Sequence, residues 1–365
     1  MVLRLCAVTY FYDFTRSLIS FGRNLRLSSQ AMTTPAKKLG TALILPGAVA
    51  KGAYEAGVIS ILTERNVKIH RIVATSSGAL NAVAYAAAIR AGTEKDLGKR
   101  LRNAWLKYGS WNKSFSFNPF LWLSGRGLSD PDGLMTMLKE LVVPSPAGAK
   151  GKIELRIIVA SMEGIRGLIG KNPATTYEKV LSFCGKDFDT QEGLDRIFKA
   201  TVAACAFPGL FAPVRLPGIG YCVDGGAVNN APVEYALDDG DIGQIIVAVP
   251  FPRLLPKPKP LHGLGLINHM AEILINERLY RDLKNAHNLN LHLADLDELV
   301  KKKKLHPQHL EAVKSVLPFR KVQIIEVRPP RALGGTVFTG FTQPDLRKKF
   351  IAEGRKAALK NLKHI

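Results

Sequence analysis

The fold is decided by one stretch of sequence, TALILPGAVAKGAYEAGVISILTERNVKIHRIVATSSGAL, which spans residues 41–80. It begins with the apolar run Thr41–Leu45, which a Pro-Gly pair ends, and a short run of this kind is typical of a buried parallel strand. Apolar residues then recur at helical spacing and predict a helix over 53–65. A second run, rich in branched residues, predicts a strand over 69–74. Strand, helix and strand in this order form a right-handed crossover unit, so we expect the two strands to lie side by side.

A tight turn and a further helix follow the second strand. The helix is expected over Ala79–Ala91, with Gly92 at its end, and its apolar residues on nearly every face predict a buried central position. The turn at Ser76 and the loop Gly47–Gly52 both leave the carboxyl ends of neighbouring parallel strands, which lie about 4.8 Å apart. Open α/β sheets bind their ligands at this edge. We therefore expect the two loops to form one site.

Ser76 is the candidate nucleophile. A serine on a tight turn between strand and helix exposes its oxygen at the positive end of the helix, where developing negative charge is favoured. The residues two before and two after it are Ala74 and Gly78, whereas Ser77 has Thr75 and Ala79 there, so Ser76 fits the turn better. Taken alone, such a motif often only caps a helix.

The first loop is the candidate source of hydrogen bonds for an oxyanion, because acyl transfer needs main-chain N–H donors beside the nucleophile. A nucleotide-binding loop would require Lys and then Ser or Thr after Gly52, but Ala53 and Tyr54 stand there, which excludes that function. The candidate oxyanion residues are Gly47, Ala48, Val49, Lys51 and Gly52.

Asp224 is the candidate base. A short strand is expected over 220–223, and Asp224 follows it directly, with Gly225 and Gly226 as flexible backbone on its far side. On its own an Asp-Gly-Gly tripeptide is simply a turn. Beside Ser76, the carboxylate becomes a partner for a nucleophile, with Gly78, Gly225 and Gly226 supporting the turns.

Three blocks of the sequence, taken together, resemble the patatin-like phospholipase family. They are Gly47–Val58, similar to the glycine-rich oxyanion block, Ala74–Ala82, similar to the nucleophile elbow, and Ala206–Val233, similar to the stretch with the catalytic Asp. The similarity extends from about Leu39 to Pro250, with a weaker likeness near Asp345–Leu362.

The resemblance implies a three-layer α/β/α fold with a mainly parallel central sheet. It also implies that Ser76 forms an acyl-enzyme and that Asp224 takes its proton and later activates water, without a histidine. The implied substrate is a glycerolipid or another acyl ester, and no cofactor or metal is expected.

The oxyanion block departs from the family pattern, because Ala48 and Val49 replace its second and third glycines. A β-branched residue with positive φ is an outlier, so either this loop has ordinary φ and ψ angles or its oxyanion hole is impaired. A catalytically weak or inactive lipid- or partner-binding protein is therefore the alternative. An α/β-hydrolase triad of Ser76, Asp224 and His262 is less favoured, because the nucleophile elbow of an α/β-hydrolase normally comes later in the chain, after several more strands.

The ends of the chain bound its organisation. The chain has 365 residues and no linker composition, which indicates one acyl hydrolase domain over 37–365. Residues 1–36 form an extension with four arginines against one acid, which suggests an organellar presequence. The competing interpretation, which we favour, is a tail or an overlong start, because Met32 opens a plausible natural beginning.

Charge and cysteine content limit the partners. The net charge of +21, including the run Lys301–Lys304, favours phosphate-bearing partners, either nucleic acid or an anionic membrane surface, and charge alone does not choose between them. No nucleic-acid-binding module is found. Apolar stretches are shorter than the roughly 20 residues of a membrane span. The four cysteines have no zinc or disulfide spacing. These features predict a cytoplasmic or peripheral membrane protein of undetermined oligomeric state.

Two further features leave alternatives open. All three tryptophans lie between Trp105 and Trp122, which suits either a lid or acyl-chain groove or simple core packing; in the first case Lys113 and Arg126 would meet lipid head groups. His306 and His309 have the spacing of metal ligands but lack companions, so we expect a surface loop there.

Overall fold

The computed structural model describes most of the chain from Leu39 onward. The described residues are 39–114, 116–117, 120, 127–169, 172–237, 240–255, 264–316, 321–363 and 365. They belong to one unit, Leu39–Ile365. The predicted tail, residues 1–36, lies outside the described residues.

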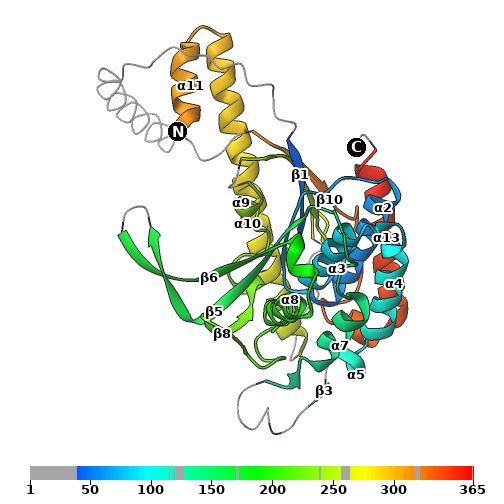
Figure 1. Ribbon diagram of the computed structural model, residues 1–365. Coiled ribbons are helices and arrows are strands. Elements are labelled where there is room, and N and C mark those ends of the chain that lie inside the picture. The colour runs from blue at the N-terminus through cyan, green and yellow to red at the C-terminus, as the bar shows by residue number, and fades with distance from the viewer. Residues whose placement is uncertain are drawn as a thin grey trace. The chain divides into compact units, whose positions relative to one another are not determined.

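An eight-stranded sheet forms the centre of this unit, with the strand order β10-β9-β1-β2-β5-β8-β7 and β6 paired to β5 (Figure 1). The first five strands of this order pair in parallel, and β6, β7 and β8 are antiparallel to their neighbours. The mainly parallel sheet is therefore confirmed. Its strands are β1 (Gly40–Leu45), β2 (Arg71–Thr75), β5 (Glu154–Ile169), β6 (Asn172–Cys184), β7 (Val214–Leu216), β8 (Gly220–Asp224), β9 (Ile242–Ala248) and β10 (Gln323–Val327).

The crossover unit predicted from residues 41–80 is present. β1 pairs with β2 in parallel, and α2 (Ala53–Glu64) connects them. The predicted second strand began too early, because β2 starts at Arg71. His70 precedes it, and its ring Nδ1 accepts a hydrogen bond from the N–H of Thr41 at 3.0 Å.

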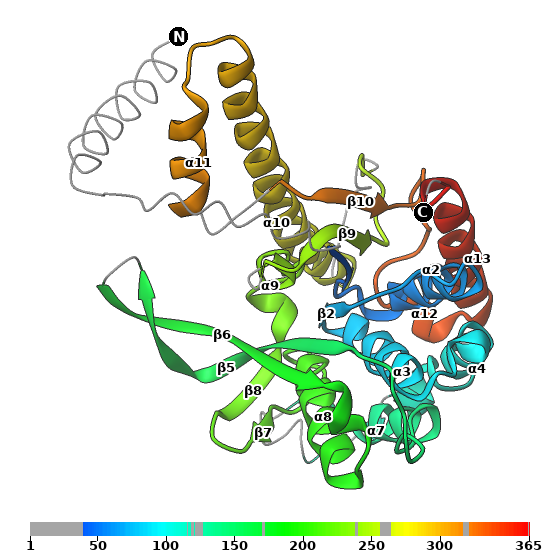
Figure 2. The ribbon, with the colours of Figure 1, turned by 45° about the horizontal axis from the view of Figure 1, so that its top comes forward.

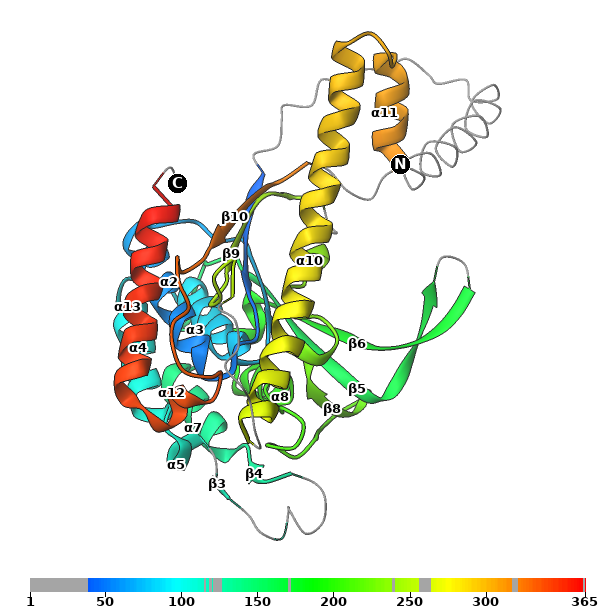
Figure 3. The ribbon, with the colours of Figure 1, turned by 180° about the vertical axis from the view of Figure 1, so that it is seen from behind.

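Helices cover both faces of the sheet (Figures 2 and 3). One face carries α2, α3 (Ser77–Ala91), α4 (Leu97–Tyr108) and α13 (Pro344–Asn361), and the other carries α9 (Glu234–Leu237) and α10 (Leu264–Lys301). This is the predicted three-layer α/β/α arrangement. α3 is the central buried helix expected behind Ser76, and Gly92 ends it with φ of 71°.

Two glycines fix the contact between α2 and α13. A Cβ on Gly57 would lie 2.0 Å from the carbonyl oxygen of Ile351, and one on Gly354 would lie 2.0 Å from that of Tyr54. The two backbones therefore approach more closely than any larger residue would permit. This packing anchors α2 and, with it, the loop that precedes the helix.

The remaining elements connect these layers. They are η2 (Val49–Gly52), η3 (Glu94–Asp96), α5 (Trp111–Ser114), β3 (Ser116–Phe117), β4 (Ser129–Asp130), α7 (Asp132–Leu141), η4 (Gly185–Phe188), α8 (Gln191–Ala204), η5 (Gly225–Ala227), α11 (Pro307–Val316) and α12 (Thr339–Thr342). Among the described residues, no helix is both long and apolar enough to cross a membrane.

Candidate active site

Ser76 lies on the turn between β2 and α3 with a strained backbone. Its φ of 52° and ψ of −135° are unusual for a residue other than glycine, and such strain typically persists where the surroundings fix it. Gly78 lets α3 approach β1, because a Cβ there would lie 2.1 Å from the carbonyl oxygen of Leu45. The side chain is largely buried, with an exposed fraction of 7% for the residue.

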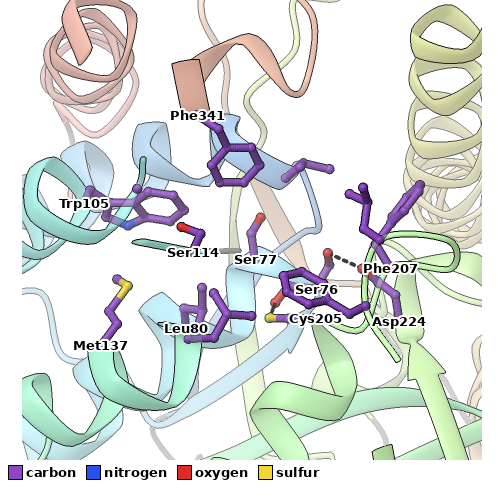
Figure 4. A pocket seen from close by; sticks show the side chains of 15 residues that line it. Ser76, Ser77, Leu80, Trp105, Ser114, Met137, Cys205, Phe207, Asp224 and Phe341 are labelled. Atoms are coloured by element: carbon purple, nitrogen blue, oxygen red, sulfur yellow. Dashed lines mark hydrogen bonds between the residues drawn. The ribbon is translucent and has the colours of Figure 1, made fainter. Parts of the chain in front are cut away.

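Asp224 ends β8, and its carboxylate meets Ser76. The Ser76 hydroxyl donates a hydrogen bond to Asp224 Oδ2 at 2.6 Å (Figure 4), and the Gly226 N–H donates to Oδ1 at 2.8 Å. The turn needs glycine at the next position, because a Cβ on Gly225 would lie 2.1 Å from the carbonyl oxygen of Ile158. β5 separates β8 from β2, so the two side chains converge from non-adjacent strands.

Burial raises the pKa of Asp224 to about 6, while the hydrogen bonds from Ser76 and Gly226 limit the rise. The carboxylate is therefore mostly ionised at neutral pH, yet its proton affinity is close to the surrounding pH. A general base works best in this range.

The loop before α2 brings main-chain N–H groups to the same place. The N–H of Gly47 donates to Asn230 Oδ1 at 2.8 Å, and that of Ala48 donates to Ser77 Oγ at 3.1 Å. The N–H of Val49 has no acceptor among the described residues, and this residue lines the pocket beside Ser76. Gly47 itself faces Ser76, because a Cβ on Gly47 would lie 2.5 Å from Ser76 Cβ.

Val49 has a φ of 54°, so the loop does not avoid the left-handed region. The sequence left two alternatives, ordinary backbone angles or an impaired hole. The backbone keeps the conformation that glycine favours, and valine occupies it. A β-branched residue in this region carries a cost on the order of 1–2 kcal/mol.

Lys51 and Gly52, the other two predicted oxyanion residues, make different contacts. The N–H of Lys51 donates to the carbonyl of Ala48 at 3.0 Å, and its buried ammonium pairs with Glu272 of α10 at 3.1 Å. The carbonyl of Gly52 accepts a hydrogen bond from Asn81 Nδ2 at 3.0 Å. Both residues thus hold the loop against neighbouring helices.

Sequence reasoning missed two asparagines that fix this loop. Asn230 accepts from the N–H of Gly47 and donates to the Gly47 carbonyl at 3.1 Å. Asn81 of α3 donates to Glu55 at 2.9 Å and accepts from the Trp105 indole at 2.8 Å. Burial raises the pKa of Glu55 well above its usual value, and the Asn81 hydrogen bond opposes this rise. Only the position of each asparagine inside a family-like block signalled a role.

A narrow pocket opens onto Ser76 and Asp224 (Figure 4). Its volume of about 40 Å³ is room for roughly three water molecules. Apolar side chains supply most of the wall, including Val49, Leu80, Trp105, Met137, Phe207 and Phe341.

The tryptophan segment is only partly described. Trp105 is almost fully buried in the core, which agrees with core packing, and it also lines the pocket. The lid or acyl-chain groove stays a prediction. Trp122 and Arg126 lie outside the described residues, and so does the side chain of Trp111. Lys113 is exposed.

Histidines contribute nothing to the described part of the pocket. His262 lies outside the described residues, so the triad alternative stays untested there. The surface loop expected at His306 and His309 is partly wrong, because Pro307 starts α11 and His309 is helical. Among the described residues, no group of three or more His, Cys, Asp or Glu side chains is placed to hold a metal.

Comparison with known proteins gives one family match. The family model described as patatin-like phospholipase matches residues 43–237. Curated protein sequences give no match. Among solved structures, VipD from Legionella pneumophila is 15% identical, with 94% of this chain and 72% of that chain covered and a TM-score of 0.41. The type III effector protein ExoU is 13% identical, with 88% and 52% covered and a TM-score of 0.31.

Proposed function

The chain belongs to the patatin-like phospholipase family, and from this premise we propose that it is a lipid acyl hydrolase with a Ser76–Asp224 dyad. One observation carries the proposal. The Ser76 hydroxyl donates to Asp224 at 2.6 Å, within the reach expected of a nucleophile and its base.

In the acylation step, Asp224 takes the proton of Ser76 as the serine oxygen attacks the ester carbonyl carbon. The tetrahedral intermediate collapses with cleavage of the bond to the alcohol, and Asp224 returns the proton to the departing oxygen. Its raised pKa of about 6 suits both transfers, because the group is ionised at rest and accepts a proton readily.

In the deacylation step, Asp224 takes a proton from water, which attacks the acyl-enzyme. The Ser76 oxygen leaves the carbonyl carbon and recovers its proton from Asp224, releasing the fatty acid. The dyad returns to its starting state without a cofactor.

The oxyanion would be held by main-chain N–H groups of the loop. Val49 is the best-placed donor, because its N–H has no acceptor among the described residues and the residue borders the pocket. The N–H of Ala48 is the second, since its present partner is the rotatable hydroxyl of Ser77.

The substrate is proposed to be a glycerolipid or another ester of an apolar acyl group, presented at a membrane surface. The mostly apolar pocket wall supports an acyl chain. The pocket of about 40 Å³ is smaller than such a chain, so productive binding requires it to widen.

The experiment is covalent labelling with a fluorophosphonate, followed by peptide mapping. We expect labelling of Ser76, its loss in Ser76→Ala, and loss of ester cleavage in Ser76→Ala and Asp224→Asn with unchanged folding. Ser114→Ala is the matched control, because Ser114 is another buried pocket serine, bonded to the Tyr108 carbonyl instead of a carboxylate. Full turnover in Asp224→Asn would remove the dyad from the proposal.

One observation favours the second candidate, a weak or inactive lipid-binding protein. Val49 occupies a backbone conformation that suits glycine, with Ala48 before it. The double variant Ala48→Gly/Val49→Gly separates the two functions. Cleavage that appears only in this variant supports the second candidate, and robust wild-type cleavage rejects it.

A further inference from the structure

The first half of α10 has an exposed apolar face. Leu266, Met270, Ile273 and Leu274 are 51%, 49%, 45% and 61% exposed. Their spacing of four, three and one residues puts them on one side of the helix. Ile275, on the opposite side, is buried, so this helix is apolar both toward the core and toward solvent.

A groove of about 550 Å³ runs along the same helix, and its lining joins apolar and basic groups. Leu255, Ile273 and Tyr280 supply exposed apolar surface. Arg253 and Lys284 line it too. This volume lies within the usual range of ligand sites, roughly 300–1,000 Å³.

Three permanently basic side chains line the groove, Arg253, Lys284 and Arg328, against two acids, the exposed Glu277 and Glu326. Glu326 is already occupied, because His287 Nε2 lies 2.6 Å from one carboxylate oxygen and Arg328 bonds the other. Burial raises the pKa of Glu326, but Arg328 and His287 outweigh it, so the pKa lies below the usual value. Lys284 has no carboxylate partner among the described residues, and Arg253, 78% exposed at its side chain, reaches Glu326 only at 4.0 Å.

The inner side of this stretch touches the candidate active site. Glu272 pairs with Lys51 at 3.1 Å, and the Ile275 carbonyl accepts from Asn230 Nδ2 at 3.2 Å. Asn230 also binds Gly47. Figure 3 shows α10 lying along the sheet on the face opposite α13. A surface that contacts the outer side of α10 would therefore lie one helix away from the oxyanion loop.

We propose that the first half of α10 and its groove form the docking surface for an anionic phospholipid bilayer. The proposal rests on the proposed lipid hydrolase function and names the surface through which that site meets its substrate. Leu266, Met270, Ile273 and Leu274 enter the interfacial layer, and Arg253 and Lys284 meet lipid phosphates. The net charge of +21 matches an anionic surface.

The experiment measures co-sedimentation of the full chain with phosphatidylcholine vesicles, with and without a minor fraction of phosphatidylglycerol. All chains carry Ser76→Ala, so that binding is measured without lipid turnover. Leu274→Asp is compared with Leu291→Asp, because both leucines lie on α10 and each is 61% exposed. We expect Leu274→Asp to lower the partition coefficient at least about tenfold and Leu291→Asp to leave it unchanged.

A charge arm tests the net negative charge of the lipid headgroups. Lys284→Gln should lower binding to the phosphatidylglycerol vesicles about fivefold and leave binding to pure phosphatidylcholine unchanged. Inorganic phosphate, used alone as a competitor at constant ionic strength, should not displace the protein. Displacement by phosphate would assign the groove to a free anion and overturn the bilayer as its occupant.

Three further outcomes would overturn the proposal: no binding of the parent chain, equal losses in the two leucine variants, or a dimer by light scattering that Leu274→Asp makes monomeric. Hydrolysis of a soluble short-chain ester, measured in the Leu274→Asp chain with Ser76 restored, tests the proposed function separately.

Discussion

Ser76 and Val49 are two residues with positive φ angles on opposite loops of one site. Their φ angles are 52° and 54°, and both line the pocket. For Ser76 the strain presents the hydroxyl to Asp224. For Val49 it leaves an N–H without an acceptor among the described residues, while the branched side chain makes the conformation costly.

Contacts of the neighbours hold both conformations. The Ser76 carbonyl accepts hydrogen bonds from the Cys205 thiol at 3.0 Å and the Ala79 N–H at 2.9 Å. Beside Val49, the Ala50 N–H donates to the Val337 carbonyl at 3.1 Å. The backbone at each position is thus imposed by the fold, and glycine is not required to reach it.

The largest effect is expected where the two loops touch, at Gly47. In Gly47→Ala the new Cβ would lie 2.5 Å from Ser76 Cβ and 2.7 Å from Asn230 Oδ1, so one loop must move. We expect turnover of a soluble ester to fall about 10²–10³-fold, the cost of losing an oxyanion donor. Ala48→Gly, which adds no atom at the next position, should stay within about threefold of wild type. A Gly47→Ala chain with normal turnover would show that the contact is loose.

The second prediction concerns the stability that the protein loses by burying the ionised carboxylate of Asp224. The pKa of Asp224 in the folded protein, about 6, lies above the ordinary value of 3.8 for this side chain. Its contribution to stability is therefore fully present below about pH 4 and is lost as the pH rises through 6. Asp224→Asn removes this loss. Above pH 6 we therefore expect the variant to have a higher free energy of unfolding than the wild type, by at most about 3 kcal/mol.

Urea unfolding at about pH 7.5 and about pH 4 measures this difference, which should nearly vanish at the lower pH. Ser76→Ala is the control, because it keeps the buried carboxylate. An Asp224→Asn chain that is less stable than wild type at both pH values would contradict the raised pKa.

The third prediction is the pH dependence of the reaction. In the proposed mechanism Asp224 must be ionised to take the Ser76 proton, so kcat/KM on an uncharged ester should fall about tenfold per pH unit below pH 6 and level off above it. Glu55→Gln is the matched control, since Glu55 is the other buried acid near the site with a raised pKa. The acid limb should persist in that variant. A limb near pH 4, or one that Glu55→Gln abolishes, would assign the titration elsewhere.

The sequence was sufficient to predict the part of the fold that local patterns of apolar residues determine. The crossover unit was predicted within a few residues of β1, α2 and β2, because buried parallel strands and helices have distinct apolar patterns. The pairing of Ser76 with Asp224 rested on the family resemblance, because β8 runs antiparallel to β5 and the strand-end argument concerns parallel strands.

Contacts between distant segments were beyond sequence reasoning. Asn230 holds Gly47 across 183 residues, and Lys51 pairs with Glu272 across 221, and no local pattern marks such partners. The conformation of Val49 was undecidable for the same reason. Its own preference opposes positive φ, and the contacts that override this preference include one to Val337, far along the chain.

The smallest effect is expected at Val49 itself, and it separates backbone strain from pocket shape. Val49→Gly removes strain on the order of 1–2 kcal/mol, but it also loses a mostly buried side chain and adds chain entropy. Because these effects oppose each other, the free energy of unfolding should change by less than about 1 kcal/mol. The side chain borders the narrow pocket, so its removal should raise turnover of bulky acyl esters relative to acetate esters. Val49→Ala also clears the pocket but keeps a Cβ at positive φ, so it should share the change in acyl preference and be less stable than Val49→Gly. If the two variants are equally stable, the positive φ at this position carries little strain. Val49 and Ser76 would then share a φ angle but not a strained backbone.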